Sequence, residues 1–417
     1  MAQLGWQPLS SFLIVKVPPR ILMPSLCLGW GIAQAAMAAA NNFGDLIVTR
    51  LFLGLFEAGC LPLFSIITSQ WFRRAEQPLR VAAWYGTNGL ATMAASILSY
   101  GFGHIHSDRL ESWRIIFLFV GLLTIVSAPF VYWRLDNDIP SARFLTEDEK
   151  PKAVERLRAN QTGTGIRKFK WAQIGELVLD PKTYLWIAMS LLLNVGASVT
   201  NTFGPLILKG LGYDKYRTTL LNIPFGFCQW IVILISSWAA QRFRLKSVVL
   251  LIITLPIVAG AAILYALPRT KSAQPGLLVG YYLLAFLFGG NPLVVAWIVG
   301  NTAGTTKKSA VMSVYSAASA AGNIIGPLLF NSRDAPEYLP GLRAVLGIFC
   351  ALVVCIGLQV VVLKFLNKLQ SKKRVKNGKP AYIKDYSMAR EYHEADTGIQ
   401  GLMDVTDRKN DEFVYIY

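Results

Sequence analysis

The chain has 417 residues, of which 53% are hydrophobic and 16% are charged, and its formal net charge at pH 7 is +17. Soluble domains have about 25% charged residues, and a chain this apolar would need a core far larger than soluble domains build. Nucleic-acid binding is not indicated by the positive charge, because Lys and Arg lie between apolar runs and near the C-terminus without the interleaved aromatic residues of RNA-binding modules. The composition therefore predicts a membrane protein.

The cysteines and histidines give no sign of a metal site or a redox centre. None of the five cysteines forms a C-x-x-C pair, all five lie in apolar stretches, and the three histidines do not make a ligand set. The chain also lacks the Gly-Lys-Ser/Thr loop of ATP-driven pumps and the H-E-x-x-H and G-x-S-x-G elements of membrane hydrolases. We therefore expect no enzyme activity, no metal and no cofactor.

Ten apolar segments are long enough to cross the hydrocarbon core of a bilayer, which needs about 20 residues of α-helix. They cover residues 20–40, 44–68, 81–103, 113–133, 183–207, 218–240, 247–267, 277–299, 309–330 and 342–364. Proline and glycine inside these segments do not argue against helices, because neighbouring helices satisfy the backbone groups that they free. The predicted fold class is all-α, a polytopic membrane protein with about ten transmembrane helices.

The connections between these segments are alternately rich and poor in Lys and Arg. The richer set contains Arg73, Arg74 and Arg80, the segment 134–182, Arg242, Arg244 and Lys246, Lys307 and Lys308, and the basic start of the C-terminal segment. Positive charge marks the cytoplasmic side of membrane proteins. This distribution therefore predicts that both chain termini lie in the cytoplasm.

A long polar connection divides the chain into unequal parts. We expect an incomplete N-terminal helical bundle over 1–133, a cytoplasmic central loop over 134–182, a C-terminal six-helix bundle over 183–366 and a cytoplasmic tail over 367–417. Thr146 and Glu149 have the spacing of a capping box, which predicts a short helix from there to Arg158. The tail is polar, first basic and then acidic, so we expect it to be mostly disordered.

Several runs along the chain resemble one transporter family, in the order in which that family has them. The run RLFLGLFEAGCLP over 50–62 resembles the fourth transmembrane helix of the anion:cation symporter family in the major facilitator superfamily. WFRRAEQPLR over 71–80, WYGTNG over 84–89 and YGFGHI over 100–105 follow, and together they resemble the fungal allantoate-permease-like branch. The resemblance continues with FLTEDE over 144–149, FKWAQ over 169–173, NTAGTTKKS over 301–309, GNIIGP over 322–327 and DVTDRKN over 404–410.

The chain departs from this family pattern at two places. The first helix of the family is absent, residues 8–19 resemble at most the end of the second, and Lys16-Val-Pro-Pro-Arg20 replaces an Asp-Arg-bearing loop. In the region of the seventh family helix, Asn194-Val-Gly-Ala-Ser198 stands where the branch has an Asn-Gly pair. The resemblance thus implies a major facilitator fold that lacks the first one to two helices.

The resemblance implies a secondary active transporter of a small organic anion, such as allantoate, a ureido acid or a vitamin-like carboxylate, by proton symport and alternating access. Its partners would be that carboxylate, a coupling cation, expected to be a proton, and the lipid bilayer of the plasma membrane. A second class stays open, a shortened homologue that does not transport or that acts as a nutrient sensor, because the N-terminal bundle has fewer helices than the fold requires. Carboxylate uptake that a protonophore abolishes would distinguish the two.

Arg50 and Glu57 are the candidate coupling residues. They are seven residues apart on one helix face, and ionisable groups inside a span are costly unless they are paired or face water. In the functional interpretation, Arg50 attracts an anion and Glu57 takes part in proton coupling. In the structural alternative, Glu57 bonds between helices and Arg50 extends to the membrane surface.

Uncharged polar residues within the spans are candidate substrate ligands, because an anion held by amide and phenol donors binds reversibly. The candidates are Tyr85, Asn88, Asn194, Asn201, Asn291 and, beside Asn201, Phe203. Hydrogen bonding between helices is the alternative role for each of the polar ones.

A third set of residues resembles the charged gate that closes the cytoplasmic side of this fold. It consists of Arg73, Arg74, Glu76 and Arg80 in the first half of the chain, and Arg242 and Lys246 in the second. The alternative is that these charges only orient the chain by contacting lipid headgroups.

Overall fold

The computed structural model describes the chain except residues 104–110, 162–167, 211–214, 269, 331, 332, 334–337 and 390–402. Within 201–218 and at 271 the side chains also lie outside the described residues. In the described part of the chain, the regular secondary structure is helical throughout, which confirms the predicted all-α fold class.

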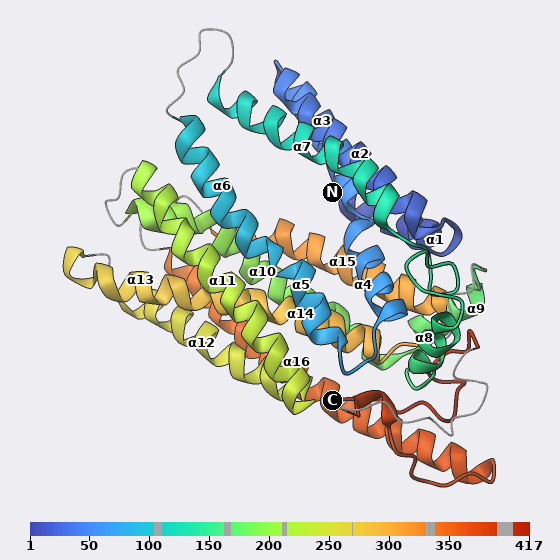
Figure 1. The fold of residues 1–417 in the computed structure, drawn as a ribbon. Helices are drawn as coiled ribbons and strands as arrows, with labels where there is room; N and C mark the ends of the chain where they lie inside the picture. The colour runs from blue at the N-terminus through green and yellow to red at the C-terminus, as the bar shows by residue number, and fades with distance from the viewer. Residues whose placement is uncertain are drawn as a thin grey trace.

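The first half of the molecule is a set of helices in which α2 packs against both α3 and α7 (Figure 1). Its elements are α1 (Ala2–Lys16), α2 (Pro19–Ala36) with the 3-10 turn η1 (Met37–Ala39), α3 (Phe43–Glu57), α4 (Cys60–Trp71), α5 (Gln77–Tyr85), α6 (Thr87–Gly103) and α7 (Ser112–Arg134). Breaks at Ala58-Gly59 and at Gly86 separate α3 from α4 and α5 from α6.

Helix α1 is longer than the helix end that the resemblance implied for residues 8–19. It also carries polar groups on buried positions, which is why its hydropathy did not mark it as a span. Gln7 donates through Nε2 to the carbonyl oxygen of Ala58 at 3.1 Å, and the hydroxyl of Ser309 on α15 donates to the carbonyl oxygen of Ser11 at 3.0 Å. Helix α1 therefore joins the first half to the second.

The second half contains the largest core of the molecule, with α14 buried at every position. Its elements are α10 (Pro181–Gly210), α11 (Lys215–Phe243), α12 (Lys246–Ala266), η2 (Lys271–Ala273), α13 (Gln274–Leu283), η3 (Leu284–Phe286), α14 (Leu287–Gly300), α15 (Thr305–Leu328) and α16 (Leu339–Lys376). Between the halves lie α8 (Glu149–Arg158) and α9 (Trp171–Val178). Helix α8 is the short helix predicted after Thr146, and the Glu149 carboxylate accepts a hydrogen bond from the Thr146 backbone N–H at 2.9 Å.

Eight helical segments of the described chain are long and apolar enough to cross a bilayer. Two of the ten predicted spans, 81–103 and 309–330, are not among them. Gly86 divides the first into the shorter helices α5 and α6, and α15 carries two lysines, Lys307 and Lys308, with several serines. The predicted polytopic membrane fold is confirmed. The helices of the two remaining predicted spans, α5 with α6 and α15, pack against the opposite half of the molecule.

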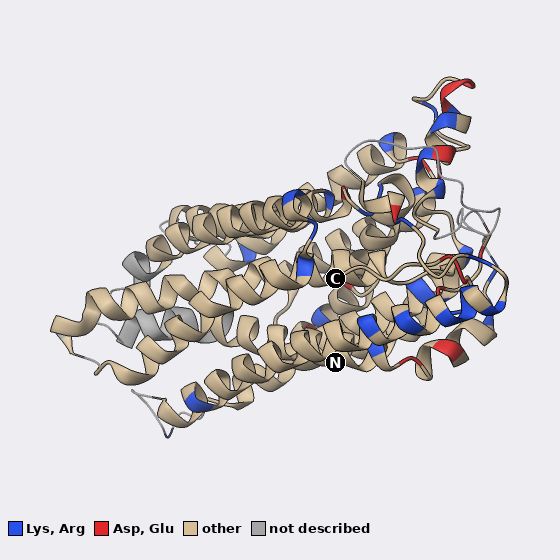
Figure 2. Ribbon diagram, turned by 90° about the horizontal axis from the view of Figure 1, so that it is seen from below, with Lys and Arg blue, Asp and Glu red and all other residues tan. Residues whose placement is uncertain are grey.

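One end of the molecule carries most of the charge. Figure 2 shows Lys and Arg gathered at the end where the segment 134–182 and the C-terminal residues lie. We call this the basic end, and the far end of the helices the opposite end.

The predicted mostly disordered tail is wrong for the residues that the structure describes. Helix α16 continues to Lys376, and residues 403–417 return to pack beneath the second half, with Asp407, Phe413 and Tyr415 at most 2% exposed. A short 3-10 turn, η5 (Tyr386–Met388), precedes them. The polar composition of the tail suggested disorder, but its charged side chains pair with residues that lie far away in the sequence, and this pairing cannot be seen in composition.

Candidate functional site

A cavity of about 360 Å³ lies between α6 of the first half and α10, α11 and α13 of the second. Its described lining consists of uncharged side chains, most of which carry a hydroxyl or an amide. The lining residues are Thr92, Ala95, Ser96, Ser99, Thr200, Thr219, Asn222, Phe225 and Tyr281. The cavity thus presents neutral hydrogen-bonding groups from both halves of the molecule.

Several of these polar groups are held in place by one another. The Tyr281 hydroxyl donates to Asn222 Oδ1 at 2.9 Å, so the position of this amide is fixed by the phenol. The Thr92 hydroxyl donates to the carbonyl oxygen of Asn88 at 3.0 Å and lies 3.4 Å from Gln229 Oε1. The lining is therefore partly preorganised before any ligand enters.

Gln229 lies behind Thr92 and has an unused donor. Its side chain is 1% exposed, and its Nε2 has no hydrogen-bond partner among the described residues. A buried amide N–H without a partner is costly, and a carboxylate oxygen would satisfy it with a charge-assisted bond. Gln229 is thus a stronger candidate ligand than the sequence indicated, because its free donor follows from packing alone.

A second polar cluster lies deeper, toward the basic end. Asn291 Oδ1 accepts from the Tyr315 hydroxyl at 2.8 Å and from Asn194 Nδ2 at 3.4 Å. Asn194 also donates to the carbonyl oxygen of Ser190 at 2.8 Å. Asn194 lies six residues from the cavity residue Thr200 on α10, which is about 9 Å along a helix. The cluster therefore stands below the cavity rather than in its wall.

The structure brings some predicted substrate ligands together and leaves others apart. Asn194 and Asn291 bond to each other, and Tyr85 is half-buried and close enough to Tyr315 for their hydroxyls to interact electrostatically. Asn88 is exposed near the start of α6. The side chains of Asn201 and Phe203 lie outside the described residues.

The two halves touch closely at a pair of glycines near the cavity. A Cβ atom on Gly89 would lie 2.6 Å from the carbonyl oxygen of Gly226, and one on Gly226 would lie 2.9 Å from the carbonyl oxygen of Gly89. Such distances leave no room for a side chain, so α6 and α11 approach backbone to backbone. The cavity is bounded there by a contact that glycine alone permits.

The predicted coupling pair lies away from the cavity. Arg50 is exposed on α3, with its guanidinium carbon 5.5 Å from the centre of the Phe117 ring on α7. Glu57 is half-buried at the end of α3 and interacts electrostatically with Arg50. Neither residue belongs to the described lining of the cavity.

The predicted gate residues separate into a buried group and an exposed group. Arg73, Arg74 and Lys246 are at most 4% exposed where the halves meet at the basic end, whereas Arg80 and Arg242 are exposed. Glu76 accepts from the Arg73 backbone N–H at 3.2 Å and forms an ion pair with Arg156 of the central loop.

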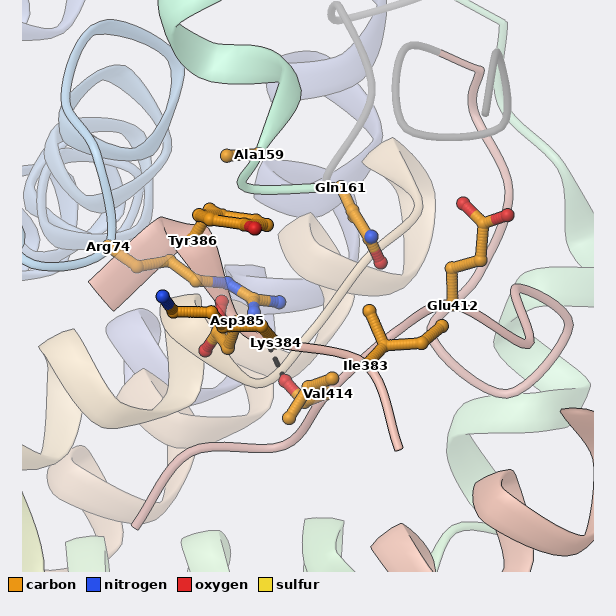
Figure 3. Close-up of a pocket in the computed structure, with 9 residues that line it drawn as sticks. All are labelled: Arg74, Ala159, Gln161, Ile383, Lys384, Asp385, Tyr386, Glu412 and Val414. Atoms are coloured by element: carbon orange, nitrogen blue, oxygen red, sulfur yellow. Dashed lines mark hydrogen bonds between the residues drawn. The ribbon is translucent and has the colours of Figure 1, made fainter. Parts of the chain in front are cut away.

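Arg74 is surrounded by residues of the central loop and the tail (Figure 3). Its Nη1 donates to the carbonyl oxygen of Val414 at 3.1 Å, and its guanidinium carbon lies 4.3 Å from the centre of the Phe413 ring. Burial lowers the pKa of this guanidinium, although Asp385, Asp407 and Tyr415 act in the opposite direction.

A buried ion network at the basic end was not found from the sequence. Asp407 of the tail contacts Lys182 and lies 3.0 Å from the Nζ of Lys307, which also lies 2.9 Å from Asp180. Burial alone would raise the pKa of Asp407, but the two lysines outweigh it and hold that pKa well below its usual range. In the sequence these charges belong to three separate polar connections, and only the fold brings them together.

Comparison with known proteins agrees with this architecture. The sequence profile described as Major Facilitator Superfamily matches residues 1–327. The chain is 30% identical over 424 residues to the thiamine pathway transporter THI73 of Saccharomyces cerevisiae, a match that covers 100% of this chain and 76% of that transporter. It is 28% identical over 404 residues to the allantoate permease of the same yeast, covering 93% of this chain and 70% of the permease.

A solved structure supports the fold. The human organic anion transporter MFSD10 superposes with a TM-score of 0.61 at 15% sequence identity, over 85% of this chain and 81% of that one. At this identity the likeness concerns the fold alone.

Proposed function

Because this chain belongs to the Major Facilitator Superfamily, we propose that it is a secondary transporter of a small organic anion that works by alternating access. The observation that carries the proposal is the cavity of about 360 Å³ between α6 and the second half, with its neutral hydroxyl and amide lining. Neutral donors can hold a carboxylate by hydrogen bonds and exchange it for water at small net cost, as a carrier requires.

The proposed substrate class is a small carboxylate, such as allantoate, a ureido acid or a vitamin-like acid. Two relatives named as an allantoate permease and a thiamine pathway transporter support small polar metabolites as the class. Behind the cavity wall, the free Nε2 of Gln229 is the donor that we propose for the carboxylate. The hydroxyls of Thr92 and Ser96 in the wall donate to the carbonyl oxygens of Asn88 and Thr92, and we propose that they turn toward the carboxylate when it binds.

The proposed coupling ion is a proton, and Glu57 is its proposed carrier. Glu57 is half-buried in the apolar part of the first half, where it interacts electrostatically with Arg50. A carboxylate in such surroundings is costly when charged, so proton binding there couples readily to a change of conformation.

We further propose that the basic end faces the cytoplasm and that the protein lies in the plasma membrane. The excess of Lys and Arg at one end supports this orientation (Figure 2), and the C-terminal Tyr417 lies at that end, where its carbonyl oxygen accepts from the Lys246 backbone N–H at 3.0 Å. Arg73, Arg74, Glu76 and Lys246 would then close the cytoplasmic side, whereas the exposed Arg80 and Arg242 are not part of the proposed gate. No enzymatic step is part of the proposal.

Uptake of labelled carboxylates tests the function. Yeast cells expressing the full chain are supplied with a panel of labelled carboxylates, including allantoate, with and without a protonophore. We expect saturable uptake of at least one acid, abolished by the protonophore. Absence of uptake for every acid, in cells where the protein reaches the plasma membrane, would contradict the proposal.

The variant Glu57→Gln tests the coupling residue separately. We expect uptake driven by a proton gradient to fall at least tenfold while exchange of labelled for unlabelled substrate persists, because exchange needs no net proton movement. Asp45→Asn is the matched control, since Asp45 is an exposed acid at the other end of the same helix. Full gradient-driven uptake in Glu57→Gln would remove Glu57 from the mechanism.

A further inference from the structure

We propose that residues 403–417 form a latch that holds the two halves of the protein together at the basic end and must detach from the first half each time that end opens. The inference rests on alternating access, which is part of the proposed function. It concerns the described stretch of the C-terminal segment, to which the proposed function gives no role.

The latch is attached firmly to the second half. Asn301 donates through Nδ2 to the carbonyl oxygen of Ile416 at 2.9 Å and accepts from the Ile416 backbone N–H at 2.8 Å. Asn367 of α16 makes the same two-way contact with the backbone of Tyr415, at 2.8 and 2.9 Å. These reciprocal hydrogen bonds hold the backbone of the latch against the helices of the second half.

Charge reinforces this attachment. Asp407 lies between Lys182 and Lys307 and accepts from the Tyr415 hydroxyl at 2.9 Å. All of these groups are at most 2% exposed. Removal of a buried, paired carboxylate from two lysines would leave uncompensated charge, so the latch does not leave the second half readily.

The contact with the first half is smaller. It centres on Arg74, whose Nη1 donates to the Val414 carbonyl and whose guanidinium stacks on the Phe413 ring. Beside it, Arg73 donates through Nη2 to the carbonyl oxygens of Tyr386 and Ala389, at 2.9 and 3.2 Å, in the tail segment that precedes the latch. Backbone carbonyls and a ring face accept these cations, and no tail carboxylate forms an ion pair with Arg74 among the described residues.

The contact at Arg74 is suited to reversible opening. Arg74 is 1% exposed, and its Nε and Nη2 have no hydrogen-bond partner in the described part of the chain. Closing therefore gains one hydrogen bond and a cation–π contact but sacrifices the hydration of two donors, and opening restores it. The free-energy difference between the closed and open states at this contact is therefore small, and binding of a transported ligand can reverse it.

This asymmetry indicates which contact breaks. The latch remains on the second half, where its carboxylate and its backbone are satisfied, and separates from Arg74. Separation would also uncover Ser309 of α15, which is fully buried against Ser11 of α1 at the same end. Accessibility of position 309 is therefore a direct measure of opening.

The test measures alkylation at position 309 and requires no substrate. The variant Ser309→Cys of the full chain is treated in inside-out membrane vesicles with a membrane-impermeant maleimide, and labelling is quantified at that site by mass spectrometry so that the native cysteines can remain. We expect slow labelling in this background. Adding Arg74→Ala or Phe413→Ala should speed labelling about tenfold, as expected when a contact worth about 1.4 kcal/mol is lost.

Arg80→Ala is the matched control. Arg80 lies six residues from Arg74, is exposed, and stacks on Phe72 of its own half at 4.7 Å instead of contacting the latch. This variant should leave the labelling rate unchanged. A second reporter, Ala296→Cys in the buried helix α14, should stay unlabelled in every variant, which excludes general unfolding.

Equal labelling rates in Arg74→Ala, Phe413→Ala and Arg80→Ala would overturn the latch, and so would labelling of Ala296→Cys that rises in parallel. Because the readout is accessibility, a protein that carries none of the tested acids can still show the latch. Conversely, active uptake with unchanged accessibility would refute the latch and leave the transport function intact.

Discussion

The two ends of the molecule close the space between the halves by different means. At the basic end, buried charges and a folded tail join α4, α10, α15 and α16, with Arg74, Lys182, Lys307 and Asp407 at most 1% exposed. Toward the opposite end, α6 and α11 meet through glycines, and the cavity beside them is lined by neutral groups. Charge is thus used where the protein is held closed, and neutral donors are used where an anion would pass.

This difference has a physical reason. Charged contacts buried from water are very costly to break when one partner is removed, so the pairs of Asp407 with Lys182 and Lys307 suit an attachment that stays in place. Neutral hydroxyls and amides exchange a ligand for water at small net cost. Substitutions at either end test this difference, and those at the charged end should have the larger effects.

The largest effect is expected from Asp407→Asn. The substitution keeps the shape of the side chain but leaves Lys182 and Lys307 with fewer negative partners in a buried site, at a cost of about 3 kcal/mol or more. The apparent Tm of the detergent-purified protein, followed by fluorescence or by aggregation, should fall by several degrees. Glu147→Gln, which removes an 88% exposed partner of Lys150, should leave it unchanged.

The sign of the pH dependence follows from the pKa of Asp407. The folded state holds the pKa of Asp407 below its value in the unfolded chain, which is about 3.9. Such a carboxylate stabilises the folded protein fully at any pH above that unfolded value, and the stabilisation is lost only as the pH falls below it. The gap in Tm between the native protein and Asp407→Asn should therefore be constant from pH 8 to pH 5 and narrow below pH 4. A gap that closed between pH 7 and pH 5 would contradict the assigned ion network.

The next effect is expected from Gly89→Ala at the contact of α6 with α11. The added Cβ would lie 2.6 Å from the Gly226 carbonyl oxygen and 2.7 Å from the Trp230 backbone nitrogen, so the two backbones must separate. Overpacking of this kind costs about 1–3 kcal/mol. We expect a lower Tm and slower uptake, whereas Gly101→Ala on the same helix, where a Cβ meets nothing within 4 Å, should be neutral. Equal behaviour of the two variants would show that the close approach is unimportant.

The fold could be predicted largely from local sequence because lipid-crossing helices need long apolar stretches that a single sequence displays. Helix α1 is the exception. It buries Gln7 against the carbonyl oxygen of Ala58 and Ser11 against Ser309 of α15, so its composition resembles that of a connection rather than a span. Hydropathy detects contact with lipid, and this helix is covered partly by protein.

The candidate site could be predicted only in part. Asn194 and Asn291 carry amides inside spans, which is unusual enough to be noticed in a sequence, and they do bond to each other. Thr92, Ser96 and Gln229 were not singled out, because Ser and Thr occur widely in membrane helices and the free donor of Gln229 depends on what surrounds it. The role of the tail was equally hidden, since each of its partners lies in another segment.

A moderate effect is expected from Gln229→Met, which keeps the size of the side chain and removes the amide. If the free Nε2 binds the substrate carboxylate, the KM for uptake should rise about tenfold, which corresponds to about 1.4 kcal/mol, with little change in Tm. Thr92→Val is the informative companion, because it removes the hydroxyl that contacts Gln229 Oε1. A KM that changes in Thr92→Val but not in Gln229→Met would transfer the binding role to the threonine.

The smallest effect is expected from Tyr315→Phe, which deletes one buried hydrogen bond and no volume. The lost bond to Asn291 Oδ1 is worth about 1 kcal/mol, and Asn194 Nδ2 remains at 3.4 Å as a second donor to the same oxygen. Because the cluster stands below the cavity, we expect a Tm lower by a degree or two and a KM within about twofold of the native value, within the range that about 0.4 kcal/mol produces. A KM raised tenfold with an unchanged Tm would instead make Asn291 and Tyr315 substrate ligands, and the binding site would then extend from the neutral cavity toward the charged end.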